Sequence, residues 1–234
     1  MQKKILVVLS VLVNLAVLAA LGVGLWLYSN PAELRDLVIG RARERVASFY
    51  EQFGVGRGEY VFLGDSITHG GLWSEMFPTT PVKGRGVGGD TTSDLLERLG
   101  AVTRGQPARL YIMIGTNDLT LGVERQQTLA NYREILERVR RESPATEIYV
   151  QSVLPRAVEY RDRIVELNRD IESLALSRGA HFIDLYAAFL GPDGSIRNDY
   201  RNDELHLTGL GYRRWQQELL PHVVEQPASP SRID

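Results

Sequence analysis

Four short stretches of the chain hold residues that could together form a hydrolytic site. In chain order they are Gly64-Asp65-Ser66-Ile67-Thr68, Gly88-Gly89-Asp90-Thr91, Gly115-Thr116-Asn117-Asp118 and Asp203-Glu204-Leu205-His206. Ser66 offers a hydroxyl nucleophile, and His206 offers a general base. Asp203, three residues before the histidine, can lie on the same face of one helical turn and orient the imidazole. The residue types therefore predict nucleophilic catalysis by a serine.

The second and third stretches supply donors for a negatively charged oxygen. Gly89 has a backbone amide that a substrate can approach closely, because glycine has no side chain, and Asn117 has a side-chain amide. Each stretch alone also fits a structural role as a helix cap, a tight turn or an Asx-turn. Their combination in one chain favours the catalytic interpretation.

Short apolar runs alternate with helical patterns around these stretches. The runs predict strands at 60–63, 109–114, 147–153 and 181–185, with another around 81–87, and the patterns predict helices at 92–102, 125–141, 160–177 and 208–224. This alternation is typical of a parallel sheet with helices on both faces, an α/β fold. Ligands bind at the carboxyl ends of such strands, and Ser66 and Asn117 each follow a predicted strand directly.

The same stretches, in this order, resemble the four sequence blocks of the SGNH or GDSL hydrolases. Two longer stretches further resemble the branch of this family that contains platelet-activating-factor acetylhydrolase subunits and bacterial esterases. They are Gly-Val-Gly-Gly-Asp-Thr-Thr at 86–92 and Leu-His-Leu-Thr-Gly-Leu-Gly-Tyr at 205–212. The resemblance covers about 60–224. It implies a three-layer α/β/α, flavodoxin-like fold and hydrolysis of an ester, with no metal and no organic cofactor.

The resemblance also implies roles for individual residues. Ser66, Asp203 and His206 would form the triad, and the amides of Ser66 and Gly89 with the side chain of Asn117 would form the oxyanion hole. The chain has Ile67-Thr68 where many members have Leu-Ser. Neither position donates catalytic chemistry, so the assignment is unaffected.

The N-terminus carries a membrane-span pattern. Lys3 and Lys4 precede an uncharged apolar run over 5–28 that ends with a Trp/Tyr pair. As a helix, the run could cross ~30 Å of hydrocarbon, whereas the apolar region of a cleaved signal peptide, the alternative, is usually ~7–15 residues long. We expect an uncleaved, single-pass anchor at 1–29.

The charges that flank this run bear on its orientation. The two lysines abut the run directly, while arginines at 35, 41, 43 and 45 lie beyond it and compete. We expect a cytoplasmic N-terminus and an exported catalytic domain in the periplasm or outside the cell.

The rest of the chain divides by composition. We expect an amphipathic helix and linker at 30–58, with a flexible junction at 54–58, then the hydrolase domain at 59–225 and a disordered tail at 226–234. The helix pattern favours packing on the domain over a membrane-surface or dimerising stem. Any amphipathic helix shows this pattern, however, so its partner stays open.

Charge and composition limit the partners. The 27 basic and 29 acidic residues are interleaved, without the basic face that nucleic acid requires, and there is no cysteine. An ester of a glycan or a lysophospholipid is the expected substrate, and the oligomeric state is open. Trp73 could stack on a sugar or pack in the core, and Arg156 could meet an acidic substrate group or be a surface charge. An acyltransferase and a non-catalytic binding protein are the alternative functions.

Overall fold

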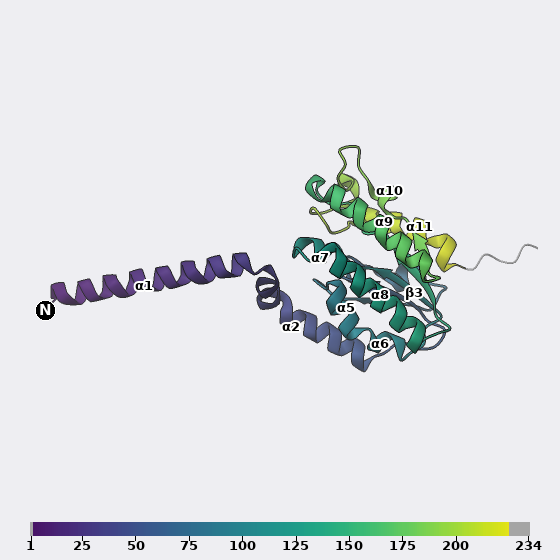
Figure 1. Cartoon of the computed structure of the whole chain (residues 1–234), viewed down its shortest axis with the longest axis horizontal. Helices are drawn as coiled ribbons and strands as arrows, with labels where there is room; N and C mark the ends of the chain where they lie inside the picture. Colours follow the sequence, from purple (N-terminus) through teal and green to yellow (C-terminus); the bar gives the residue numbers. More distant parts are fainter. Residues whose placement is uncertain (1, 225–234) are drawn as a thin grey trace, which may run out of the picture. The chain divides into compact units, whose positions relative to one another are not determined.

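The computed structural model describes residues 2–224 of the chain, which divide into two compact units, one that ends at Ala42 and one that begins at Arg43 (Figure 1). The first unit contains helix α1, Gln2–Ser29, and the beginning of α2, Pro31–Gln52. In α1, the segment Lys4–Ser29 has a mean hydropathy of 2.7 and none of it is buried. Its length and composition suit a membrane span, and a signal sequence would pass the same test.

The second unit is built on a five-stranded parallel sheet. The strands are β1, Tyr60–Gly64, β2, Val82–Gly86, β3, Arg109–Met113, β4, Glu147–Gln151, and β5, His181–Ile183. They lie in the order β2-β1-β3-β4-β5, the arrangement of flavodoxin-like sheets. The five strands expected from apolar runs are confirmed, and so is the α/β fold. In this order β1 lies between β2 and β3, so the carboxyl ends of these three strands meet at one edge.

Helices cover both faces of the sheet. Their bounds are α3 Ser66–His69, α4 Trp73–Met76, α5 Thr92–Arg98, α6 Gly100–Thr103, α7 Thr116–Thr120, α8 Arg125–Glu142, α9 Arg161–Ser177, α10 Tyr186–Phe189 and α11 Gly209–Val223, with 3₁₀ turns at Val158–Tyr160 and Asn198–Tyr200. Figure 1 shows α8 and α9 running alongside each other over one face. The long helices match the helices that the 3.6-residue pattern predicts.

Alternation along the strands divides the core between the two faces. In β1, Val61 and Leu63 join a cluster with side chains of α5, α6, α8 and α9, whereas Tyr60 and Phe62 join a second cluster with α3, α4, α10 and α11. Successive side chains of a strand point to opposite faces, so a strand covered on both sides is apolar throughout. This explains why the sequence of β1 is apolar from Tyr60 to Leu63.

The segment before β1 belongs to the second unit and forms hydrogen bonds with the end of β2. Tyr50 on α2 donates a hydrogen bond from its hydroxyl to the Gly86 carbonyl, at 3.1 Å. One nitrogen of Arg85 donates to the carbonyls of Phe53 and Gly54, at 2.8 and 2.9 Å. The compact unit that contains the sheet therefore includes Arg43 and the residues after it, and the expected start of the hydrolase domain at residue 59 stays a prediction.

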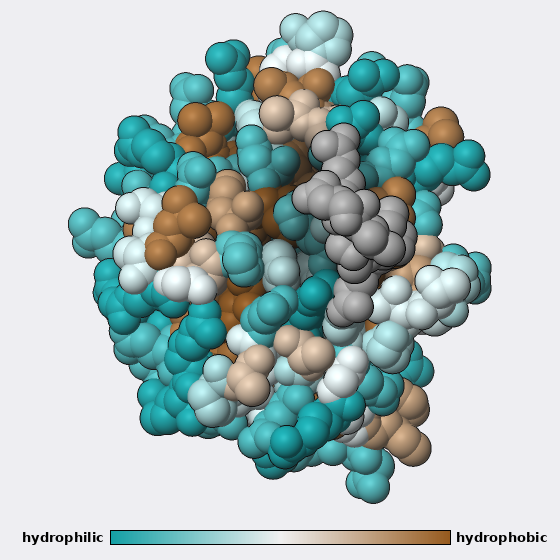
Figure 2. Space-filling model, turned by 90° about the vertical axis from the view of Figure 1, so that its right-hand side faces the viewer, coloured by the Kyte–Doolittle hydropathy of each residue, from teal (hydrophilic) through white to brown (hydrophobic). Residues whose placement is uncertain are grey.

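One face of the structure is mainly polar. Figure 2 shows one face on which hydrophilic residues predominate and hydrophobic ones form small, separate groups. This agrees with the interleaved charges of the sequence. The tail expected to be disordered, 226–234, lies outside the described residues.

Candidate active site

Ser66 lies at the carboxyl end of β1, as the first residue of α3. Asp65 caps this helix, since its Oδ1 accepts a hydrogen bond from the Ile67 amide at 2.9 Å. The preceding Gly64 must lack a side chain, because a Cβ there would lie 2.2 Å from the Met113 carbonyl oxygen. The turn that presents the serine is thus held by close packing against β3 and by a buried cap.

Ser66, His206 and Asp203 form a continuous hydrogen-bonded chain. The Nε2 atom of His206 lies 2.9 Å from Ser66 Oγ, and its Nδ1 lies 2.8 Å from Asp203 Oδ2. An ionised carboxylate only accepts hydrogen bonds, so Nδ1 carries the proton and donates it to Asp203. Nε2 of the neutral ring is then free to accept a hydrogen bond from the Ser66 hydroxyl. The geometry suits a general base that acts on the serine.

Asp203 is held in its ionised form by the loop that carries it. Its Oδ1 accepts hydrogen bonds from the backbone amides of Leu205 and His206, at 2.7 and 2.6 Å. Partial burial works against the charge, but these amides and the His206 ring outweigh it and lower the pKa of Asp203 to about 2. The carboxylate therefore stays charged throughout the physiological pH range and fixes the imidazole.

Gly89 and Asn117 approach Ser66 from the ends of β2 and β3. Gly89 has a φ of 77°, a left-handed conformation that glycine adopts without strain. A Cβ on the neighbouring Gly88 would lie 4.0 Å from Ser66 Cβ, so this turn lies directly beside the serine. Asn117, on α7, donates from Nδ2 to the Asp90 carbonyl at 2.9 Å. The structure therefore joins Ser66, His206 and Asp203, places the Gly88-Gly89 turn beside Ser66 and connects Asn117 to Asp90, the residue after this turn; the role of Gly89 and Asn117 in an oxyanion hole stays a prediction.

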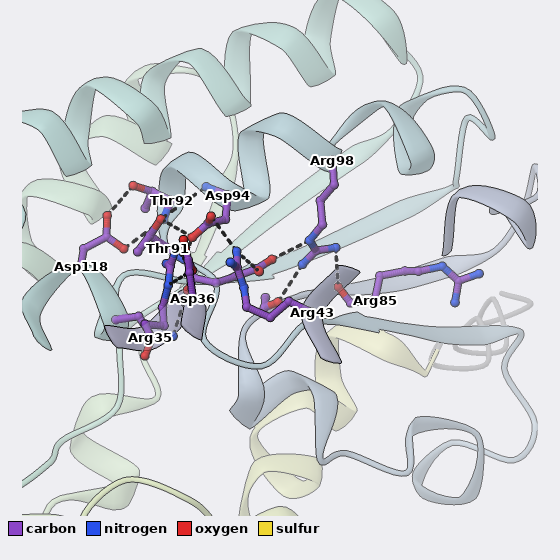
Figure 3. A network of polar contacts seen from close by, with 12 residues as sticks. Arg35, Asp36, Arg43, Arg85, Thr91, Thr92, Asp94, Arg98 and Asp118 are labelled. Carbon is purple, nitrogen blue, oxygen red and sulfur yellow. Dashed lines mark hydrogen bonds and ion pairs between the residues drawn. The ribbon is translucent and has the colours of Figure 1, made fainter. Parts of the chain in front are cut away.

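Buried carboxylates support the two turns that carry these donors. Asp118 Oδ2 accepts from the Thr92 amide at 2.9 Å and Oδ1 from the Thr92 hydroxyl at 2.5 Å, and Figure 3 shows the two side chains facing each other. Asp90 Oδ2 accepts from Arg98 Nε at 2.6 Å. The sequence indicates only a turn and an Asx motif at these two aspartates, because no local pattern reveals a partner 26 residues away.

Trp73 is buried, which favours the core-packing interpretation over sugar stacking, and a contact with substrate stays a prediction. Its side chain is 3% exposed and lies flat on Phe62, with 3.8 Å between ring centroids. Its indole nitrogen donates to the Thr68 carbonyl at 2.9 Å. The stacked ring face and the indole nitrogen are thus engaged in the core, which supports the packing interpretation.

Arg156 is partly buried and forms hydrogen bonds with residues of α7. Its Nη1 donates to the Thr116 carbonyl at 3.1 Å and to the Thr120 hydroxyl at 2.8 Å, and its guanidinium lies 4.0 Å from the Tyr160 ring centroid. Burial lowers the pKa of Arg156, although nearby acids, Asp65 among them, oppose this. The residue directly after Thr116 is Asn117, so Arg156 supports the element that carries a candidate oxyanion donor. A contact with substrate stays a prediction.

Within residues 2–224, no group of three or more His, Cys, Asp or Glu side chains is placed to hold a metal ion. The donors that the site offers are instead hydroxyl, imidazole and amide groups. Their arrangement suits acyl transfer through the serine.

Comparison with known proteins places this site in a family. The model of the GDSL-like Lipase/Acylhydrolase family matches residues 62–214. Platelet-activating factor acetylhydrolase IB subunit alpha1 of Rattus norvegicus is 30% identical over 165 residues, covering 66% of this chain and 70% of that protein.

Two solved structures share the fold. A structure from Streptococcus pneumonia named for platelet activating factor matches with a TM-score of 0.76 at 26% identity, over 84% of this chain and 99% of that chain. A GDSL-like lipase from Bacteroides thetaiotaomicron matches with a TM-score of 0.64 at 26% identity, over 70% of this chain and 87% of that chain. The resemblance seen in the sequence blocks is confirmed: the chain belongs to the GDSL-like lipase/acylhydrolase family and is a hydrolase of the esterase type.

Proposed function

We propose that the chain hydrolyses short acyl esters, acetyl esters above all, through an acyl-enzyme on Ser66. The observation that carries this proposal is the hydrogen-bonded chain from Asp203 through His206 to Ser66, with distances of 2.8 and 2.9 Å. Each member is held by backbone contacts of its own, so the constellation exists before any substrate binds. Such preorganisation is what nucleophilic catalysis requires.

In the first half-reaction, Ser66 Oγ attacks the acyl carbon while His206 Nε2 takes the hydroxyl proton. The carbonyl oxygen becomes an oxyanion, which the amides of Ser66 and Gly89 and the side chain of Asn117 stabilise. Asp203 keeps the imidazole in place and stabilises the imidazolium. The C–O bond to the alcohol then breaks, and the proton on Nε2 passes to the leaving alkoxide.

In the second half-reaction, water takes the place of the alcohol. His206 removes a proton from the water as its oxygen attacks the acyl-serine, and the same three donors stabilise the second oxyanion. Collapse of this intermediate releases the carboxylic acid, and the proton returns to Ser66 Oγ. An acyltransferase would differ only here, because the hydroxyl of an acceptor would replace water.

We propose a glycan or a lysophospholipid as the alcohol part of the ester. The acetylhydrolase name of the relative supports a short acyl group. The candidate span Lys4–Ser29 supports a membrane-tethered enzyme, which would meet both lipids and envelope glycans. With Lys3 and Lys4 on the cytoplasmic side, the domain would lie in the periplasm or outside the cell.

Activity-based labelling tests the proposed chemistry. Full-length protein in a non-ionic detergent is treated with a fluorophosphonate probe, and its turnover is measured on acetylated oligosaccharides and on acetylated lysophospholipids. Wild-type protein should be labelled and active on one ester class, and Ser66→Ala should lose both properties. Added acceptor sugars divert the acyl group only if the protein is a transferase. An unlabelled and inactive wild type would leave the binding-protein alternative standing.

The orientation has a separate test. The chain has no cysteine, so a single exposed cysteine provides a unique label site. Arg169, whose side chain is 73% exposed on α9, is a suitable position. We expect a membrane-impermeant maleimide to label Arg169→Cys in intact cells, or in cells with a permeabilised outer membrane. Labelling only after complete lysis would place the domain in the cytoplasm.

A further inference from the structure

Arg43, on the second half of α2, reaches two carboxylates beside the candidate oxyanion site. Its Nη2 lies 3.1 Å from Asp90 Oδ1 and 2.6 Å from Asp94 Oδ1. Arg98 contacts the other oxygen of Asp90, at 2.6 Å. Figure 3 shows Arg43 in this network with Asp94 and Arg98. Only 16% of the Arg43 side chain and 2% of the Asp90 side chain are exposed, so this is not a solvated surface pair.

The network leads directly to Asn117. The Asp90 carbonyl accepts one hydrogen of the Asn117 side-chain amide, at 2.9 Å. A primary amide has two hydrogens, so the position of Asp90 sets the direction of the second one, which is available to a substrate oxygen. Arg98 also donates to the Gly64 carbonyl at 2.9 Å, close to Ser66. Asp90 therefore connects the end of β1 with the residue that carries a candidate donor.

Charge balance explains why Asp90 needs Arg43. Burial raises the pKa of Asp90, and the two arginines act against this by favouring its charged form. Asp94 belongs to the same cluster through its contact with Arg43. Its other oxygen accepts a hydrogen bond from the Thr91 amide at 2.8 Å, as part of the capping box of α5. Without Arg43, Oδ1 of the buried Asp90 carboxylate loses its charged partner, and the bridge that Arg43 makes between Asp90 and Asp94 is lost.

We propose that Arg43 is a positioning residue of the esterase: by holding Asp90, it aims the side chain of Asn117 at the oxyanion. The proposal rests on the proposed function of Ser66 and Asn117. It means that α2, the helix that begins at Pro31 just after α1, contributes to the active site although none of its residues contacts the reacting atoms. Arg43 thus acts through Asp90.

Kinetics of the full-length protein in detergent test this role with p-nitrophenyl acetate as the substrate. Arg43→Ala should lower kcat about tenfold and leave KM within twofold, because misaligned donors weaken transition-state binding more than ground-state binding. Arg43→Lys should recover most of the rate, since a single nitrogen bridges both carboxylates. Arg45→Ala removes an exposed arginine of the same helix and should leave kcat unchanged.

A double-mutant cycle separates positioning from general destabilisation. In an Asn117→Ala background, Arg43→Ala should reduce kcat by less than twofold, because the group that it aims is gone. The same tenfold loss in both backgrounds would overturn the proposal, and so would an unchanged kcat in Arg43→Ala alone. Thermal melting checks each variant. If Arg43→Ala does not fold, the same kcat comparison in both backgrounds is made with Arg43→Gln.

The outcomes also distinguish this inference from the function on which it rests. If wild-type protein neither reacts with fluorophosphonate nor turns over an ester, the proposed function itself fails. If the wild type is active and Arg43→Ala matches it, only the role of Arg43 fails.

Discussion

Asp65, the neighbour of Ser66, should make the stability of the domain depend on pH. Its side chain is buried, with 1% exposed, and its Oδ1 caps α3. Its Oδ2 has no hydrogen-bond partner among the described residues. Burial is the main reason that the pKa of Asp65 rises from 3.8 to about 7. The charges of Asp90 and Asp118 also raise this pKa, whereas the hydrogen bond from the Ile67 amide and the charge of His206 lower it.

The sign of the effect follows from proton binding. Between the unfolded pKa of 3.8 and the folded pKa of about 7, the folded state holds a proton that the unfolded state has lost. Unfolding then releases a proton, so the free energy of unfolding falls as the pH rises through this window and levels off above it. A shift of about three pKa units at 1.36 kcal/mol each corresponds to about 4 kcal/mol.

Asp65→Asn removes this titration and keeps an oxygen to cap α3. We compare the melting temperatures of the variant and the wild type in the same detergent at pH 4 and at pH 8. The difference, variant minus wild type, should rise by about 10 °C between the two pH values, since 1 kcal/mol shifts the midpoint of a domain of this size by roughly 2–4 °C. Subtraction cancels the groups that both proteins share.

Glu172→Gln on the surface of α9 serves as the matched control, because it also removes one carboxylate charge. Its difference from the wild type should change little with pH. If the Asp65→Asn difference is the same at pH 4 and pH 8, the Asp65 carboxyl does not carry a raised pKa. The reasoning from burial would then be refuted.

Three further variants probe the site and its packing. Asn117→Ala should lower kcat by about 10²–10³, the usual cost of one oxyanion donor, in the p-nitrophenyl acetate assay, and an unaltered rate would remove Asn117 from the hole. Gly86→Ala would place a Cβ 2.2 Å from the backbone nitrogen of His69, so we expect a melting temperature several degrees lower and reduced phosphonate labelling. Trp73→Phe loses the hydrogen bond to the Thr68 carbonyl, so the free energy of unfolding should fall by about 1–3 kcal/mol while KM stays unchanged. A raised KM would instead indicate that Trp73 contacts the substrate.

The sequence predicts much of the fold because the sheet is buried on both faces. A short apolar run such as 60–63, with glycines close to both ends, then indicates a buried strand, and Gly64 and Ser66 fall at the edge where parallel strands end. The pairing of His206 with Asp203 was also predictable, because a spacing of three residues lets both side chains lie on the same side of one turn. These inferences depend on local spacing.

Contacts between distant residues were not predictable in this way. The amphipathic pattern of α2 shows that one side is covered, but it does not say that Arg43 meets Asp90, 47 residues later. Trp73 shows the converse case, since an aromatic residue near a nucleophile can either stack on a sugar or pack in the core, although core packing is the more common role. Only the packing of α3 and α4 on β1 decides between them.

Attachment of α2 to the domain has a consequence for proteolytic release. Within the second unit, Arg43, Tyr50 and the carbonyls of Phe53 and Gly54 contact residues at the end of β2 and in the turn that follows it. Cleavage near Ser29 would leave all of these contacts on the released enzyme, whereas cleavage in the glycine-rich segment before Tyr60 would remove Arg43 and Tyr50. A shed form cut early should thus keep full turnover, and one cut late should be a slower catalyst even with its triad intact.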